Sequence, residues 1–269
     1  MIAAVELSYV DLGLAALLVL ANAGVSLALR LGLGRRLLVA ALRATVQLAL
    51  LGLVLAWVFD TEGPGAVLSI MLVMAIIAGV EAVRRGQRRL PGIFAASIGV
   101  MLVSSFAVTL YGLIVVIDTP GAWYTPQYAI PLLGMVLGNT LNGISLGLDA
   151  VLEGFDEDRA RVELLLAHGA TRRQASSSVL RRAARRGMIP ILNSMVAVGV
   201  ISVPGMMTGQ LLAGEDPATA ARYQLFILFA IAAGVALGTM GVVLAAERLV
   251  FDERDRLRVD RLRRVDLED

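Results

Sequence analysis

The sequence contains no cysteine and no lysine, and its only histidine is His168. Without cysteine, the chain forms no disulfide, thiolate metal site or cysteine nucleophile. Without lysine, it has no P-loop of the form G-x-x-x-x-G-K-[ST], because the lysine of that motif binds the nucleotide phosphates. One histidine excludes the zinc motif H-E-x-x-H, and the sequence assigns no metal ligands. We therefore expect the chain to bind no cofactor, and any ATP and Mg²⁺ that power it to bind a separate subunit.

Charge is scarce as well. Charged residues make up 17% of the 269 residues and hydrophobic residues 58%, with a mean hydropathy of +0.78. A soluble domain carries about 25% charged residues, so the composition indicates an integral membrane protein. Seven apolar segments have the roughly 20 residues that a helix needs to cross a bilayer, and they predict an all-α polytopic bundle in one domain, residues 1–269. The predicted spans are Tyr9–Leu31, Leu37–Phe59, Ala66–Val83, Ile93–Ile117, Gln127–Val151, Met188–Ala213 and Tyr223–Val250.

The arginines are distributed unevenly between the connections of these spans. They concentrate after the first, third, fifth and seventh spans, whereas the other three connections contain only Arg222. By the positive-inside rule the N-terminus faces outward and the C-terminus lies in the cytoplasm, so we expect a multi-pass protein of the inner (plasma) membrane. Two segments are then cytoplasmic: a helical hairpin over residues 152–187, and a charged tail over residues 251–269, which we expect to form a short solvated helix.

The hairpin has features of a docking element. Val162, Leu165 and Leu166 recur at helical spacing and form an apolar stripe. Gly169 ends this helix, and a T-x-x-Q capping box at Thr171 starts the next. A solvated loop needs no such stripe, so we interpret it as the surface that couples to an ATPase; alternatively, the six arginines that follow hold the hairpin on anionic lipid. The candidate coupling residues are Glu163, Leu165, Leu166, His168 and Gly169.

Polar residues inside the predicted spans are functional candidates because they are expensive to place in lipid. Arg43 and Gln47 are one helical turn apart in the second span, and Glu81 lies at a similar depth in the third. We predict an ion pair between Arg43 and Glu81; alternatively, each side chain reaches the nearby headgroups.

The fifth and sixth spans hold the candidate substrate path. Asn139 and Asn142 are three residues apart and project to one helix face. Pro190 and Pro204 each remove a backbone donor and disfavour a straight helix, and such a break is tolerated where it lines a cavity. The alternatives are asparagines that bond across a helix interface and methionines that are apolar filler. The candidate path residues are Asn139, Asn142, Met206, Met207, Thr208 and Gln210.

Four G-x-x-x-G spacings predict close helix packing, unless they arise by chance from the 27 glycines. They are Gly134–Gly138, Gly143–Gly147, Gly205–Gly209 and Gly234–Gly238. The second also fits the G-x-S-x-G elbow of serine hydrolases, with Ser145 as nucleophile. We disfavour a hydrolase because Ser145 falls within a predicted helix and the only histidine lies in the hairpin. The sequence therefore predicts a transporter subunit and not an enzyme.

Two resemblances extend this interpretation. Glu163 followed six residues later by Gly169 resembles the E-A-A-x-x-x-G coupling loop of bacterial ABC-importer permeases, although Leu164 and Leu165 replace the two alanines. A closer likeness covers nearly the whole chain. The segments RATVQLALLGLVL, LGNTLNGISLGLD, ELLLAHGAT and ISVPGMMTGQLLAGEDPATAARYQ resemble the FetB family of iron-export ABC permeases.

The FetB resemblance implies a permease that forms a homodimer and pairs with two copies of a separate ATP-binding subunit. It implies export of iron or another metal ion, and plant relatives are associated with aluminium tolerance. The expected partners are the ATPase subunit, a second permease and the lipid bilayer, with no role for nucleic acid. An alternative function is an ion-gradient-driven carrier or channel without an ATPase, with Glu81 or Asp149 as its protonatable group.

Overall fold

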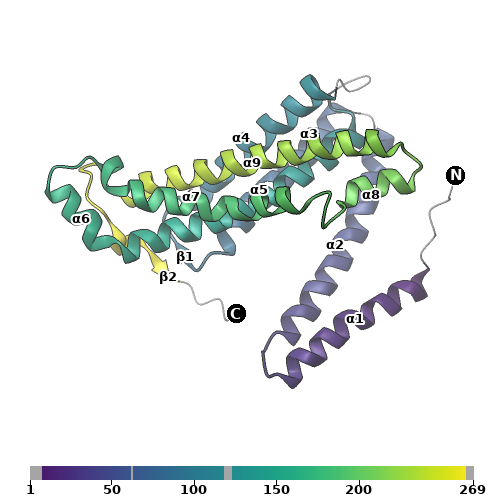
Figure 1. Cartoon of the computed structure of the whole chain (residues 1–269), viewed down its shortest axis with the longest axis horizontal. Coiled ribbons are helices and arrows are strands. Elements are labelled where there is room, and N and C mark those ends of the chain that lie inside the picture. The colour runs from purple at the N-terminus through teal and green to yellow at the C-terminus, as the bar shows by residue number, and fades with distance from the viewer. Residues whose placement is uncertain (1–7, 62, 118–122, 265–269) are drawn as a thin grey trace.

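The computed structural model describes residues 8–61, 63–117 and 123–264, which are mostly helical (Figure 1). The elements are α1 (Tyr9–Ala28), α2 (Gly34–Thr61), α3 (Pro64–Arg84), β1 (Arg88–Arg89), α4 (Ile93–Tyr111), a π-helical turn (Gly112–Val116), α5 (Pro126–Glu157), α6 (Arg159–Ala167), α7 (Arg172–Ala197), α8 (Gly205–Leu212), α9 (Pro217–Val250), a 3-10 turn (Val259–Arg261) and β2 (Arg263–Arg264). The chain is therefore an all-α membrane bundle, as the composition predicts.

Several helices begin on residues that cap or preset the first turn. The carboxylate of Asp216 accepts from the Thr219 amide at 3.0 Å at the start of α9. Pro64, Pro126 and Pro217 occupy the first positions of α3, α5 and α9, where a proline lacks only an N–H that has no helical partner. These local signals fix where the long helices start.

Figure 1 shows α3, α4, α5, α7 and α9 packed alongside one another, whereas α1 and α2 form a pair that extends away from this body. Helix α6, the β1–β2 pair and the end of α9 lie at one end of the body, which we call the arginine-rich side. At about 1.5 Å per residue, the 32 residues of α5 and the 34 of α9 exceed a bilayer core of about 30 Å. Both helices are therefore longer than one membrane crossing requires.

The structure does not confirm the sixth predicted span as one continuous helix. Six helices of the described ranges are long and apolar enough to cross a membrane: α1, α2, α3, α4 with its π-turn, α5 and α9. The segment predicted as Met188–Ala213 consists of the end of α7, an irregular stretch over 198–204, and the short α8. Gly199 adopts a φ of +82° there, and Pro204 disfavours helical geometry at the residue before it. Pro190, by contrast, lies inside α7 without ending it.

Helices α5, α7 and α9 approach one another through glycines. A Cβ atom at Gly143 would lie 2.7 Å from the Thr239 hydroxyl of α9, and one at Gly187 of α7 would lie 2.6 Å from the Gly143 carbonyl. The close packing predicted for Gly143–Gly147 and Gly234–Gly238 is confirmed, because both pairs face side chains of the opposite helix. The spacings at Gly134–Gly138 and Gly205–Gly209 face mostly open space. Ser145 lies within the unbroken α5, so the elbow geometry of a serine hydrolase is absent at this residue.

The tail from Phe251 onward does not form the predicted solvated helix over its described residues. Phe251 and Leu257 are buried and joined by an isolated β-bridge. Beyond them, β2 pairs antiparallel with β1 of the α3–α4 connection. Backbone amides of Arg256 and Arg254 donate to Asp252, and the bond from Arg256 in particular holds the pKa of Asp252 at about 2. The tail thus folds back onto the helix ends.

The glycine crossing predicts a clear difference between two substitutions in α5. We expect Gly143→Ala to destabilise the protein by about 1–3 kcal/mol, because the added methyl overlaps Thr239. Gly138→Ala adds the same methyl where no atom lies within 4 Å, so we expect unchanged or slightly higher stability. Thermal unfolding in detergent measures both, and equal melting temperatures for the two variants contradict the crossing.

Candidate functional site

The break between α7 and α8 opens onto a hollow of about 470 Å³ that is lined by both apolar and polar side chains. Its polar side chains come from three helices and the irregular stretch, and the Pro204 that starts α8 lies at its edge. The Asn139 amide donates to the Met135 carbonyl at 2.9 Å, which leaves the Asn139 side-chain oxygen available. The polar lining residues are Asn139, Asn193, Ser194, Ser202 and Gln224.

A second hollow of about 360 Å³ follows along the same helices. Its lining includes Met206 and Gln210 of α8, Glu215 just after α8, and Met135, which is one turn from Asn139 on α5. The side-chain oxygens of Gln210 and Gln224 are both buried without a hydrogen-bond partner among the described residues. Buried polar atoms are normally satisfied, so these oxygens indicate that the two hollows accommodate polar groups.

The structure separates the other predicted path residues. Asn142 turns away from Asn139, because its side-chain oxygen accepts from Arg85 at 2.9 Å. Thr208 is exposed and donates to the Pro204 carbonyl at 3.1 Å, and Met207 is half-buried. The substrate path predicted from sequence is therefore divided between the two hollows and the helix surface.

Sequence reasoning missed four residues of the first hollow: Asn193, Ser194, Ser202 and Gln224. A signal was present, since Asn193 and Ser194 lie within about one turn of the end of α7, next to the break that Pro204 predicts. Polar side chains flanking a break in a membrane helix are expected to face its cavity. Gln224 carries no such signal, because its position opposite the break depends on how α9 packs.

The predicted pair of Arg43 and Glu81 is wrong. The carboxylate of Glu81 lies 3.8 Å from the Arg85 guanidinium, four residues along α3. Arg43 and Gln47 are exposed on α2, which diverges from the body. Arg85 thus bridges Glu81 and Asn142 and ties α3 to α5.

The hairpin is present as α6 and the start of α7, but its apolar stripe faces inward. Val162 is only 1% exposed, and Leu165 and Leu166 pack against the core of the chain. The argument from an exposed stripe to a docking surface therefore fails for these three residues. The outward side of α6 instead carries Leu164, which is 58% exposed, and Glu163. Leu164 is the exposed apolar side chain of α6 that sequence reasoning missed.

The turn of the hairpin has the predicted caps. Gly169 has a φ of +85°, and the amides of Gly169 and Ala170 donate to the Leu166 and Leu165 carbonyls, which is the Schellman arrangement. At the start of α7, the Thr171 hydroxyl accepts from the Gln174 amide at 3.3 Å, and the Gln174 side chain returns a bond to the Thr171 amide at 2.9 Å. The capping box is confirmed, and backbone and side-chain hydrogen bonds hold both ends of the turn.

The outward residues of α6 are also ordered. The Arg159 guanidinium donates to Glu163 at 2.8 Å, and this bond raises the pKa of Arg159 above its ordinary value. A ring nitrogen of His168 lies 2.8 Å from the Leu164 carbonyl, so the histidine completes the end of the helix. No cluster of three or more His, Asp or Glu side chains suited to a metal ion occurs in the described ranges.

Ion pairs attach the hairpin to the body. Arg182 of α7 pairs with Asp158 between α5 and α6. Glu153 of α5 lies 2.7 Å from Arg186 of α7 and 3.9 Å from Arg88 of β1. Acidic residues of α5 thus hold α7 on one side and the α3–α4 connection on the other.

A buried carboxylate connects the start of α7 to the end of α9. Glu247 is 4% exposed and accepts from the Ser176 hydroxyl at 2.7 Å. Arg172 lies 4.0 Å from Glu247, 3.4 Å from Asp255 of the tail and over the ring of Phe251. A buried charge is tolerated only when it is paired and hydrogen-bonded, so these contacts fix the base of the hairpin on α9.

Comparison with known proteins places this arrangement in a family. A family model described as uncharacterised protein family UPF0014 matches residues 9–251. The chain belongs to this family. Of the curated UPF0014 relatives, membrane protein slr1647 of Synechocystis is 39% identical over 96% of this chain and 99% of its own length. The probable iron export permease protein FetB of Escherichia coli is 29% identical over 94% of this chain and 96% of its own length.

Protein ALUMINUM SENSITIVE 3 of Arabidopsis thaliana is 31% identical over 69% of this chain and 66% of its own length. No solved structure matches the chain. The likeness to FetB inferred from the sequence motifs is confirmed, and the chain is a polytopic helical membrane protein of the UPF0014 family. Both hollows and the hairpin fall within the UPF0014 match, whereas the tail after residue 251 lies beyond it.

Because Glu247 is buried, we expect substitutions of the two neighbouring serines to affect stability unequally. We expect Ser176→Ala to cost about 1–3 kcal/mol, because it leaves a buried carboxylate without its hydroxyl donor. Ser177→Ala removes only a bond to the Gln174 carbonyl in the same helix, so we expect a near-neutral effect. Thermal unfolding and limited proteolysis of the hairpin measure both. Equal resistance of the two variants refutes the anchoring role of Glu247.

Proposed function

We propose that this protein is the membrane permease of an ABC exporter, that it moves a metal ion, and that a separate subunit hydrolyses the ATP. The main support for this proposal is that one helix, α7, runs from the capped turn of the exposed hairpin to the break beside the first hollow. A push on the hairpin therefore acts directly on the hollow. The FetB relative, named as a probable iron export permease, supports the same function.

The exposed side of α6 supports an ATPase contact. Leu164 presents an apolar side chain outward, beside an ordered Glu163–Arg159 ion pair. A short helix that presents an apolar side chain beside charged groups is suited to lie in an apolar groove of a partner protein. By this proposal Leu165 and Leu166 support the helix from behind, and His168 and Gly169 shape its end.

The chemistry of the hollows supports a metal ion as substrate. Amide and hydroxyl oxygens, such as those of Asn139, Ser202 and Gln224, are ligands for hard cations, whereas the thioethers of Met135 and Met206 suit softer ones. These ligands are neutral, so each holds a cation weakly, and Glu215, which also lines the second hollow, adds the negative charge of a carboxylate. A transport path requires such weak, successive sites, because a bound ion must also leave.

A second copy of the permease is part of the proposal. Val200 in the irregular stretch is 89% exposed and Ile201 is 81% exposed, although non-helical backbone at membrane depth must be covered by protein or water. Helices α1 and α2 bury almost none of their apolar surface, and Arg43 lies on the exposed α2. A homodimer provides protein to cover the break and polar neighbours for Arg43.

The ion-gradient carrier is less well supported. Glu81 forms an ion pair with Arg85, and Asp149 accepts from the Gln87 backbone amide at 3.2 Å. Both candidate proton carriers are thus engaged in holding α3 and its connection. A carrier also has no use for a rigid, capped hairpin outside the membrane.

The ATPase contact is tested at Leu164. We expect Leu164→Asp to abolish co-purification with the ATP-binding subunit and to lower the ATP hydrolysis of the complex by at least about tenfold, as for loss of a hot-spot contact. Leu33→Asp is the control, because Leu33 is also an exposed leucine in an arginine-bearing connection. Full complex formation and ATP hydrolysis by the Leu164 variant refute the coupling role.

The substrate path is tested at Gln224. We expect Gln224→Leu to lower metal efflux from cells about tenfold or more while ATP hydrolysis by the assembled complex is retained. Because the Gln224 oxygen is buried without a partner, its removal is not expected to destabilise the fold. Asn22→Leu replaces an exposed amide of α1 and serves as the control. Wild-type efflux by the Gln224 variant excludes this hollow from the path.

A further inference from the structure

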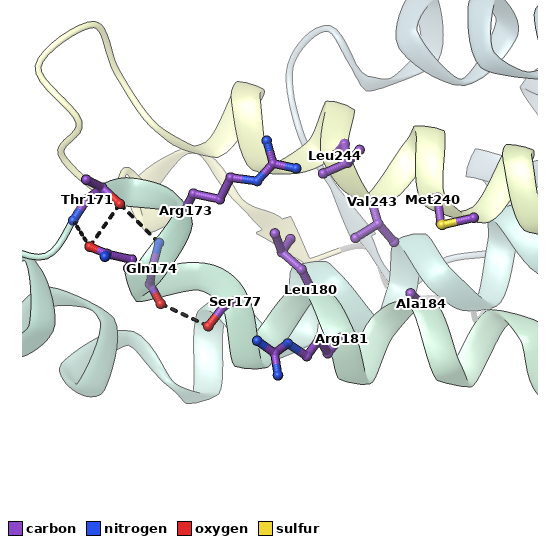
Figure 2. A pocket seen from close by; sticks show the side chains of 10 residues that line it. All are labelled: Thr171, Arg173, Gln174, Ser177, Leu180, Arg181, Ala184, Met240, Val243 and Leu244. Carbon is purple, nitrogen blue, oxygen red and sulfur yellow. Dashed lines mark hydrogen bonds between the residues drawn. The ribbon is translucent and has the colours of Figure 1, made fainter.

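A groove of about 750 Å³ lies between α7 and α9 on the arginine-rich side (Figure 2). Its apolar part is formed by Leu180 and Ala184 of α7 and by Met240, Val243 and Leu244 of α9. Met240 and Leu244 are 48% and 38% exposed, so this part is open to molecules from outside. The hollows at the α7–α8 break share no lining residue with it.

The other end of the groove is polar and basic. Figure 2 shows Arg173 extending along the groove toward Leu244, and Arg181 lying along the opposite edge. The remaining polar groups are already used: Thr171 and Gln174 bond to each other, and the Ser177 hydroxyl donates to the Gln174 carbonyl at 3.0 Å. The two guanidinium groups are therefore the free binding groups of the groove.

Three of the six arginines of α7 pair with carboxylates, whereas Arg173, Arg181 and Arg185 form no ion pair with a described residue. Arg172, Arg182 and Arg186 pair with carboxylates of the tail, the α5–α6 junction and α5. Of the other three, Arg173 and Arg181 line the groove. Two unneutralised positive charges beside an apolar trough are complementary to a ligand with an anionic head and an apolar chain.

The depth of the groove matches the membrane interface. Twenty residues of helix, or about 30 Å, separate Tyr223 near the start of α9 from Val243 in the groove. This distance is about the thickness of the hydrocarbon core. Val243 thus lies near the inner boundary of the hydrocarbon. Arg181 lies level with the apolar part, between Leu180 and Ala184 of α7, and Arg173 lies about two helical turns farther out, in the headgroup region.

We propose that this groove binds one anionic phospholipid, with its phosphate on Arg173 and Arg181 and an acyl chain along Met240, Val243 and Leu244. Basic pockets between membrane helices on the cytoplasmic side are suited to such headgroups. The site lies at the joint between the hairpin and α9, so the bound lipid stabilises the hairpin in its observed position. This inference does not depend on the transported substrate or on an ATPase.

The experiment uses the full chain purified in detergent and titrated with phosphatidylglycerol, phosphatidylcholine or inorganic phosphate. We expect phosphatidylglycerol alone to raise the melting temperature, and native mass spectrometry to detect one retained lipid. The double variant Arg173→Gln, Arg181→Gln is expected to bind phosphatidylglycerol about 25-fold more weakly, or about fivefold for each arginine. Leu244→Trp fills the apolar part of the groove and keeps both arginines. We expect it to weaken the binding of phosphatidylglycerol as well.

The matched control is Arg161→Gln, Arg185→Gln, which removes two exposed hairpin arginines that do not line the groove. We expect it to bind the lipid within about twofold of the unaltered protein. An equal loss in both double variants overturns the proposal in favour of general attraction to an anionic surface. The proposal is also overturned if phosphatidylcholine raises the melting temperature as much as phosphatidylglycerol does, or if inorganic phosphate alone gives the full increase. A changed oligomeric mass without a changed lipid count in the groove variants identifies the groove as a contact between copies and also overturns it.

Discussion

The close crossing of α5, α7 and α9 is the constraint on which the other features depend. At Gly143 and Gly187 the backbones of α5 and α7 approach so closely that a Cβ atom at Gly187 would lie 2.6 Å from the facing carbonyl. Thr239 of α9 fills the space that both glycines leave. In a membrane, where lipid is as apolar as leucine, such close contact is the main source of attraction between helices. The crossing therefore acts as a fixed point, with the hairpin on one side of it and the broken α7–α8 segment on the other.

The carboxylates on one side of this crossing have partners, whereas two glutamine oxygens on the other side have none within the described ranges. On the arginine-rich side, Glu153, Asp158 and Glu247 are all paired with arginines or hydroxyls. At the break, the oxygens of Gln210 and Gln224 have no partner among the described residues. Unsatisfied buried groups cost free energy, and a protein retains them where something else satisfies them during function. The arginine-rich side, where buried Arg88 Nε also lacks a hydrogen-bond partner among the described residues, is suited to transmitting force through its ion pairs. The side at the break is suited to a changing polar occupant.

The sequence predicted those parts of the structure that depend on local chemistry. The capping box at Thr171, the helix end at Gly169 and the break before Pro204 all follow from interactions within a few residues. It failed where the outcome depends on distant partners. Pro190 and Pro204 look alike in sequence, yet only Pro204 has a glycine in a left-handed conformation and a β-branched run before it. The tail was mistaken for a solvated helix because its pairing with β1 links residues far apart in the chain.

The stripe of Val162, Leu165 and Leu166 shows why spacing alone does not identify a docking surface. Helical periodicity establishes that one face of α6 is apolar, but it does not say whether that face meets the same chain or another. Here the chain itself covers Val162, and the residue between the stripe positions, Leu164, is the one left in solvent. A leucine that is mostly exposed contributes little to the stability of the isolated chain. In the proposed complex Leu164 contacts the ATP-binding subunit, and α7 connects the hairpin to the hollow at the α7–α8 break.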